Sequence, residues 1–336
     1  MSSLKSIAAD IGVSHVLVSR VLNNRMGTTR VSEKTREAIL RRAQELDYQP
    51  NPLALALKQG RRGVIGLFVH GVGAPGSDLN VDFILSATQK ASDMRMNLWL
   101  QFFEHDDEFI SACNSKLLRK IDGLIVAGIS HPQLTKKLNE MESQGLPVVS
   151  ACHKDPEVRD FVNFQVDATA QCYLTTAHLI EIGCRRIAHF NVGASWPFRQ
   201  QGYEKAHLEM GLLVDKRLIF PSKNYNAKAG YESMALLVES GETFDGLVAQ
   251  SDAQAVGALH YLLERGWPRE RWPKITGVDN SPIAQFYSPV PLTSVTAEMA
   301  TCARLALGAL EQKFKREPVE SHLVPPQLVI RQSTVP

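Results

Sequence analysis

Short β-rich runs alternate with amphipathic helical stretches from Val64 onward, and this rhythm limits the possible folds more than any other feature. The runs include "VIGLFV", "GLIVAG", "RIAHFNV" and "KITGVDN". Such alternation predicts βαβ units and parallel sheets. A break at 153–161, "HKDPEVRDF", divides the pattern into two halves of similar rhythm. We therefore expect two doubly wound α/β lobes with a ligand cleft between them, because open α/β sheets bind ligands outside the carboxyl ends of their strands.

The first 50 residues show a helical pattern instead. In "SLKSIAADIGVSHVLVSRVLNN" apolar residues recur at helical spacing on either side of a glycine turn, and Ser14 suits the cap of the second helix. A third helix is expected after Ser32, with Arg36, Arg41 and Arg42 available to solvent or phosphate. These signals predict a three-helix, helix-turn-helix head.

Charge is distributed unevenly along the chain. Residues 1–62 hold 11 Lys and Arg against 5 Asp and Glu, a net +6, whereas the rest holds 26 against 30, a net −4. A basic head on a mildly acidic body is typical of a nucleic-acid-binding module attached to another domain. No apolar run approaches the roughly 20 residues of a membrane span. The start lacks the order of a signal peptide and the five cysteines are scattered, so we expect a soluble cytoplasmic protein without membrane partners.

The stretch "YQPNPLALALKQGRR" (48–62) predicts a short helix in an unusual place. Asn51 suits its cap, Pro52 its first position and Gly60 the residue past its end. A helix of about two turns is marginal in water, because nucleation fixes several dihedral angles for one hydrogen bond. We expect this segment to form only when something binds it.

Several longer stretches resemble the lactose-repressor (LacI/GalR) family of bacterial transcription regulators, in the same order along the whole chain. They are "DIGVSHVLVSRVLNN", "RVSEKTREAILRRAQELDYQPNPLALAL", "HLIEIGCRRIAHFNVG", "RQQGYEKAHLEMGL", "SDAQAVGALHYLLERG", "ITGVDN", "PLTSV" and "LVPPQLVIRQST". The resemblance implies three parts acting as a homodimer on double-stranded operator DNA. These are a helix-turn-helix head (1–50), a hinge helix and linker (51–62), and a two-lobed, periplasmic-binding-protein-like α/β body that binds a small effector (63–336). Lobe 1 would cover about 63–160 plus part of 291–320, and lobe 2 about 161–290 plus the C-terminus.

The resemblance also assigns candidate DNA contacts. On the second head helix, Arg20 matches an arginine that reads a base, which suits a guanidinium facing guanine, while a phosphate contact or a solvated charge is the alternative. His15 and Val16 match positions that vary with the operator, and Ser19 shares their exposed face. Leu17 departs from the family's usual threonine, which places that phosphate contact in doubt. In the hinge helix, Leu57 matches a leucine that wedges into the minor groove, with Ala54 also facing the groove. The alternative is that the hinge leucines pack against the body.

In the body the resemblance points to an effector site. Arg199 and Asp279 match residues that hold effector hydroxyls, and a guanidinium and a carboxylate suit vicinal diols. The other candidates are Trp196, Phe198 and Tyr225, which could stack on a sugar or belong to the core, and Asp252, which could contact ligand or cap a helix. Cys152 stands where many members place a carboxylate, and Ala297 where some place a polar contact. The effector therefore cannot be named, although a sugar or sugar derivative is expected.

Enzymatic patterns are missing from the sequence. There is no G-x-G-x-x-G after a strand, no P-loop, no HExxH and no G-x-S-x-G, so we predict no catalytic residue, metal or cofactor. The chain ends in "QLVIRQST" without a heptad tail, and we expect a dimer. The leading hypothesis is a ligand-controlled transcription factor that acts as a repressor, with activation as the open alternative. The alternative is a two-lobed solute-binding protein or enzyme without a role in gene regulation.

Overall fold

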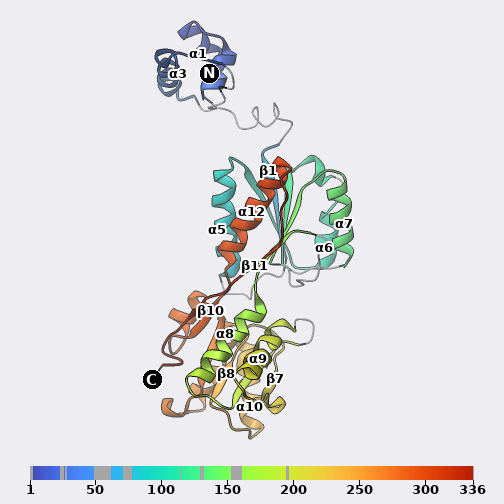
Figure 1. The fold of residues 1–336 in the computed structure, drawn as a ribbon, viewed down its shortest axis with the longest axis vertical. Coiled ribbons are helices and arrows are strands. Elements are labelled where there is room, and N and C mark those ends of the chain that lie inside the picture. The colour runs from blue at the N-terminus through green and yellow to red at the C-terminus, as the bar shows by residue number, and fades with distance from the viewer. Residues whose placement is uncertain are drawn as a thin grey trace. The chain divides into compact units, whose positions relative to one another are not determined.

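The computed structural model describes two compact units, Met1–Gly63 and Val64–Pro336. The residues described are 3–22, 26, 29–48, 62–70, 78–114, 116–128, 132–152, 161–193 and 197–335. The predicted hinge helix with Ala54 and Leu57 lies outside these residues, as does Trp196. Figure 1 shows the helical head and the larger α/β body.

The head contains the three predicted helices, α1 (Leu4–Ile11), α2 (His15–Leu22) and α3 (Glu33–Glu45). The caps are the expected ones: the Ser14 hydroxyl accepts from the backbone N–H of Leu17 at 3.2 Å, and Ser32 caps α3 by accepting from Thr35 at 3.1 Å. The helices meet around a small apolar core whose central side chains, Ile7, Val18 and Ile39, are fully buried. The three-helix prediction is confirmed.

The first lobe of the body is a six-stranded sheet in the order β11-β5-β4-β3-β1-β2, all parallel. Its central strand β3 is buried along its whole length, as expected for a parallel strand covered on both faces. The strands are β1 (Val64–His70), β2 (Asn97–Phe103), β3 (Gly123–Gly128), β4 (Val148–Ala151), β5 (Asn163–Val166) and β11 (His322–Val324).

The second lobe is a six-stranded sheet in the order β12-β10-β9-β8-β6-β7, parallel except for β12, which is antiparallel to β10. Its strands are β6 (Ile187–Asn191), β7 (Ile219–Pro221), β8 (Gly246–Val248), β9 (Lys274–Asp279), β10 (Thr293–Thr296) and β12 (Leu328–Val329). The prediction of two lobes built on mostly parallel sheets is confirmed.

Helices cover both faces of each sheet and bury its apolar side chains. In the first lobe α5 and α12 cover one face and α6 and α7 the other (Figure 1). In the second lobe α8 packs against α9 and α10 against α11. The helices are α5 (Leu79–Asp93), α6 (Asp106–Ala112), α7 (Pro132–Ser143), α8 (Ala168–Glu181), α9 (Phe198–Glu209), α10 (Ala227–Glu239), α11 (Asp252–Glu264) and α12 (Met299–Lys315).

The chain passes between the lobes three times, after β5, after β10 and after β11. Strand β5 belongs to the first sheet because it pairs with β4 and β11. The first lobe therefore extends to Val166, a few residues beyond the boundary expected near residue 160. Likewise β10 belongs to the second sheet, so only α12 and β11 return to the first lobe.

Two observations bear on other function classes. Within the described ranges, no helix has the length and apolar character needed to cross a membrane. The same residues contain no group of three or more His, Cys, Asp or Glu side chains arranged to hold a metal ion.

Candidate functional site

Helix α2 presents the predicted DNA-contacting residues on one face. His15, Val16 and Arg20 are exposed and Ser19 is partly buried, whereas Val18 and Val21 face the core of the head. The Nη1 atom of Arg20 donates a hydrogen bond to the hydroxyl of Thr29, which follows the helix. An exposed arginine flanked by short side chains is suited to reach a base edge.

Two other head residues have structural contacts. Leu17, the departure from the family pattern, is half-buried and packs against the head core, so its side chain stabilises α2. Arg42 is ion-paired with Asp10 of α1 at 2.7 Å and with Glu45 at 2.8 Å. It therefore links α3 to α1 while its side chain stays 36% exposed, so its availability to solvent or phosphate stays a prediction.

In the body, Arg199 and Tyr225 lie together at the carboxyl ends of the second sheet. Arg199 is in the first turn of α9, and its Nη1 atom donates to the backbone carbonyl of Gln250, just after β8. Its Nη2 atom donates to Oε1 of Gln171 on α8 at 3.4 Å. The guanidinium carbon lies 5.3 Å from the ring centroid of Tyr225. These contacts hold the arginine head at the end of the sheet where ligands of such folds bind.

Three buried polar atoms near Arg199 have no hydrogen-bond partner among the described residues: Nε of Arg199, Oε1 of Gln250 and Nδ1 of His189. The Gln250 and His189 side chains contact each other through their Nε2 atoms at 3.0 Å. Burial lowers the pKa of His189 to about 3, so the ring is neutral at physiological pH. Because buried polar groups are nearly always paired, this cluster has hydrogen-bonding capacity left for a ligand or for water.

Asp279 ends β9 in a strained backbone conformation. Its φ is +115° and that of Asn280 is +50°, both in a region that non-glycine residues avoid. Strain of this kind is concentrated at functional sites. Burial raises the pKa of the Asp279 carboxyl well above its usual value, the neighbouring Asp252 raises it further, and Arg199 opposes both. No described residue donates a hydrogen bond to this carboxyl group, which leaves it able to accept from a ligand.

Asp252, the first residue of α11, is fully buried and already engaged. One carboxylate oxygen accepts from the Ser294 hydroxyl at 2.5 Å, and the other accepts from the backbone N–H of Ser281 at 2.8 Å and from its hydroxyl at 3.0 Å. A Cβ atom at Gly277 would lie 2.3 Å from this carboxylate, so β9 needs glycine there. Burial raises the pKa of Asp252 to about 6. The residue joins α11 to the ends of β9 and β10, behind Asp279.

A close helix contact positions Arg199. Gly202 follows Arg199 by three residues on α9, and a Cβ atom there would lie 2.1 Å from the backbone oxygen of Thr169 on α8. Only glycine permits this approach, which brings the start of α9 within reach of Gln171. Phe198, the first residue of α9, precedes Arg199 in the sequence, and its side chain is half-buried.

The two departures from the family pattern lie in different lobes, Cys152 in the first and Ala297 after β10 of the second. Cys152 follows β4 in the first lobe, and its thiol donates to the Met299 sulfur at 3.6 Å. Burial and a hydrogen bond with Cys302 raise its pKa, with the Cys302 contact the larger cause. Ala297 is almost fully buried and donates its N–H to the backbone carbonyl of Asp279 at 3.2 Å.

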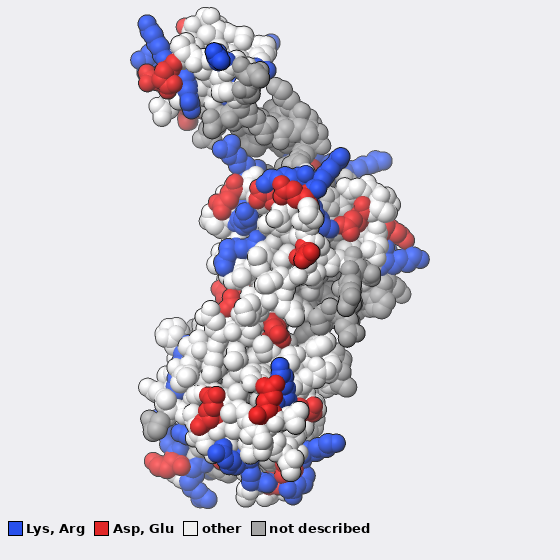
Figure 2. All heavy atoms as spheres, viewed as in Figure 1, with Lys and Arg blue, Asp and Glu red and all other residues white. Residues whose placement is uncertain are grey.

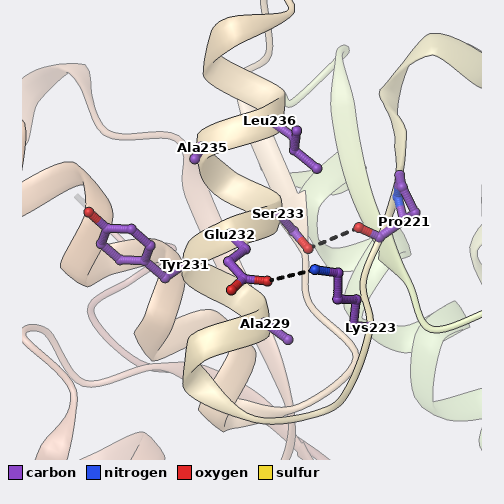
Figure 3. Close-up of a pocket in the computed structure, with 8 residues that line it drawn as sticks. All are labelled: Pro221, Lys223, Ala229, Tyr231, Glu232, Ser233, Ala235 and Leu236. Carbon is purple, nitrogen blue, oxygen red and sulfur yellow. Dashed lines mark hydrogen bonds and ion pairs between the residues drawn. The ribbon is translucent and has the colours of Figure 1, made fainter.

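A groove of about 330 Å³ lies elsewhere on the second lobe, between α10 and β7 (Figure 3). Its walls include the ion pair of Lys223 with Glu232 at 3.5 Å and the hydrogen bond from Ser233 to the carbonyl of Pro221 at 3.0 Å. None of the predicted effector residues lines it. We do not assign the groove to the effector.

The surface of the body carries exposed apolar side chains as well as charges. In Figure 2 basic and acidic side chains are interspersed over the viewed face of each lobe. Val81 and Leu85, one turn apart on α5, are 50% and 63% exposed. In the second lobe Phe286 and Tyr287, at the end of a single π-helical turn (Ile283–Tyr287), are each 71% exposed. Large apolar side chains exposed in pairs are typical of interaction surfaces.

The residues Gln171, His189 and Gln250 were not predicted from the sequence. The sequence does contain a signal for His189 and Gln250, because "RIAHFNV" and "GLVAQS" place a polar residue inside or just after an otherwise apolar strand. A buried polar residue in such a run needs a partner. Gln171 stands within a helix and gives no comparable signal.

Two family models match this chain. Residues 3–51 match the model described as bacterial regulatory proteins, lacI family, and residues 176–334 match the periplasmic binding protein-like domain. The HTH-type transcriptional repressor PurR of Glaesserella parasuis is 26% identical over 99% of this chain and 98% of its own length. The HTH-type transcriptional regulator DegA of Bacillus subtilis is 27% identical over 100% of this chain and 98% of its own.

Solved structures show the same fold over the full length. The lac repressor dimer bound to operator and an anti-inducer matches with a TM-score of 0.77 and 20% identity, covering 100% of this chain and 99% of that one. The transcriptional regulator CelR in complex with cellobiose matches with a TM-score of 0.72 and 24% identity, covering 99% and 100%. The named relatives are regulators and not enzymes. The chain joins a lacI-family DNA-binding domain to a periplasmic-binding-protein-like domain, and the relatives that it resembles over its whole length are named as transcriptional regulators.

Proposed function

We propose that this regulator is a repressor that binds operator DNA as a homodimer and is controlled by a small polyhydroxyl ligand, a sugar or sugar derivative, bound between its lobes. Such a protein acts on chromosomal DNA and therefore works in the cytoplasm. The observation that carries the ligand assignment is the unused hydrogen-bonding capacity at the end of the second sheet. Among the described residues, nothing pairs with buried Nε of Arg199 or Oε1 of Gln250. None of the described residues donates a hydrogen bond to the Asp279 carboxyl group.

Donors and acceptors placed side by side fit a ligand that is itself both donor and acceptor. A hydroxyl group can accept from the Arg199 guanidinium and donate to the Asp279 carboxylate. Asp279 binds most strongly when ionised, so its raised pKa predicts that ligand binding is favoured as pH rises through that pKa. Tyr225 can contact the apolar face of a sugar ring. Asp252 is proposed as a support for this site, since both its oxygens are occupied.

The head supplies DNA recognition in this proposal. His15, Val16, Ser19 and Arg20 would face the major groove, and Arg20 would discriminate one base pair by about 1–3 kcal/mol. The dimer interface would include the exposed apolar pairs Val81 with Leu85 and Phe286 with Tyr287, since a second copy of the chain would remove these side chains from water. The alternative, a solute-binding protein without a regulatory role, leaves the lacI-type head unexplained.

The test has a DNA arm and a ligand arm. Selection from random DNA with the full chain should yield a pseudo-palindromic site, and Arg20→Ala should lose preference at one position in each half-site. Absence of any preferred sequence would contradict the regulator assignment for this chain.

For the ligand arm, calorimetry with a panel of mono- and disaccharides that includes cellobiose should find a binder. Arg199→Lys and Asp279→Asn should each weaken its binding at least about tenfold, because lysine lacks the planar fork of donors and asparagine lacks the negative charge of the acceptor. Glu232→Gln, which alters a partly exposed carboxylate in the groove of Figure 3, is the matched control and should bind normally. Normal binding by both site variants would refute the assignment of the site.

A further inference from the structure

The three crossover segments between the lobes are hydrogen-bonded to one another. The N–H of Asp167 in the first segment donates to the carbonyl of Val324 in the third at 3.0 Å. Thr296 in the second and Gln327 in the third are joined twice, by Thr296 N–H to the Gln327 carbonyl and by Gln327 N–H to the Thr296 hydroxyl, both at 2.9 Å. Any change of lobe arrangement must act on these segments, since they are the covalent links between the sheets.

A single buried side chain connects this junction to Arg199. Gln171 lies in the first turn of α8, just after the first crossover, and is fully buried. Its Nε2 atom donates to the carbonyl of Thr296 at 2.8 Å, while its Oε1 atom accepts from Nη2 of Arg199 at 3.4 Å. The amide therefore has one end on the second crossover and the other on the candidate ligand site.

The backbone makes a parallel connection from Asp279. Its carbonyl accepts from the N–H of Ala297, the residue after Thr296, at 3.2 Å. Arg199 is thus connected to Thr296 through the Gln171 side chain, and Asp279 is hydrogen-bonded directly to Ala297, the next residue of the same crossover. Only the first connection can be removed by a side-chain substitution.

We propose that Gln171 is a positioning residue that passes the state of Arg199 to the second crossover. A ligand that draws Nη2 of Arg199 toward itself withdraws the donor from Oε1 of Gln171. A buried amide oxygen without a donor is unfavourable, so the amide reorients and its bond to the Thr296 carbonyl changes. The effector can shift the lobe arrangement only through such a difference between two states. This inference rests on the proposed ligand site, but its test needs neither ligand nor DNA.

The experiment is a double-mutant cycle on the full-length protein, read by amide hydrogen exchange at Thr296, Ala297 and Gln327. Arg199→Met removes the donor and should change exchange at these amides by about threefold or more, as expected for directly coupled residues. In a Gln171→Met background, which keeps the size of the side chain but removes both hydrogen bonds, Arg199→Met should have no further effect. If Gln171→Met does not fold, Gln171→Glu serves instead, because a carboxylate still accepts from Arg199 but cannot donate to Thr296.

The control is Thr176→Val on the same helix. Thr176 is also fully buried, and its hydroxyl donates to the Cys172 carbonyl within α8 at 2.6 Å without contacting Arg199 or Thr296. The Arg199→Met effect should persist in this background. An equal effect of Arg199→Met with and without Gln171, no effect in the wild type, or loss of the effect in Thr176→Val would each overturn the proposal. Failure of the DNA or sugar experiments would bear on the proposed function alone.

Discussion

Replacing His189 by Gln should remove a large part of the protein's sensitivity to acid. His189 is fully buried in β6, stacked on Tyr203, and burial lowers its pKa from 6.5 to about 3. The unfolded chain binds this proton near pH 6.5, while the folded chain does not until about pH 3. Protons therefore bind preferentially to the unfolded chain below pH 6.5, and the free energy of unfolding falls as the pH drops from 6.5 toward 3.

The size of the effect follows from these two pKa values. Between pH 7 and pH 5 the free energy of unfolding should fall by about 2 kcal/mol because of His189 alone. Burial also lowers the pKa of His178 and His207, which adds to the loss. Asp252 acts in the opposite direction, since its pKa is raised to about 6 and protonation favours the folded state by about 1 kcal/mol over the same range. The contribution of His189 is therefore obtained from the difference in the free energy of unfolding between the wild type and His189→Gln.

Urea unfolding followed by circular dichroism at pH 7 and pH 5 measures that difference. Because Gln does not titrate, the gap between wild type and His189→Gln should narrow by about 2 kcal/mol on going to pH 5. His260→Gln, on the exposed face of α11, is the control and should follow the wild type at both pH values. An equal gap at pH 7 and pH 5 would show that His189 does not bind its proton differently in the two states.

Three further predictions follow from packing and exposure. Gly202→Ala places a Cβ atom 2.1 Å from a backbone oxygen of α8 and should lower the free energy of unfolding by about 3 kcal/mol. In the control, Gly308→Ala on α12, the new Cβ atom meets no atom within 4 Å, so thermal melting should show a lower melting temperature for Gly202→Ala alone. Leu85→Glu should dissociate the dimer in sedimentation, while Leu213→Glu, at a 94% exposed site in the second lobe, should not; a dimeric Leu85→Glu would exclude α5 from the interface. Leu57→Ala should reduce operator affinity and DNA bending in gel-shift assays while sparing the melting temperature of the free protein, and a large drop in that temperature would place the side chain in the protein core.

The head could be predicted from the sequence because its signals are local. Caps at Ser14 and Ser32 and the apolar spacing between them depend on residues within one or two turns, and the three helices formed where these signals placed them. The ion pair of Arg42 could not be predicted, because its partner Asp10 is 32 residues away. No local pattern reports which surface arginine finds a carboxylate across two helices.

The two lobes were also predictable, but their junction was not. Alternating runs identify strands and helices, since each must bury an apolar face. They do not say that β5 belongs to the first sheet and β10 to the second, because strand order depends on pairing between distant segments. Gln171 illustrates the same limit: its importance comes from Thr296, 125 residues later, and from Arg199.

Asp252 and Asp279 show how the surroundings separate two residues that the sequence treats alike. Each adjoins a strand of the second sheet, each was a candidate ligand contact, and burial raises the pKa of both. Asp252 accepts hydrogen bonds from Ser281, two residues after β9, and from Ser294 of β10, and these bonds counteract part of the cost of burial. No described residue donates to Asp279 in this way, and the charge of its carboxyl group is disfavoured by burial and by Asp252 and favoured by Arg199. A ligand hydroxyl that donates to Asp279 would supply what the serines supply to Asp252, so binding there relieves a cost that the folded protein already bears.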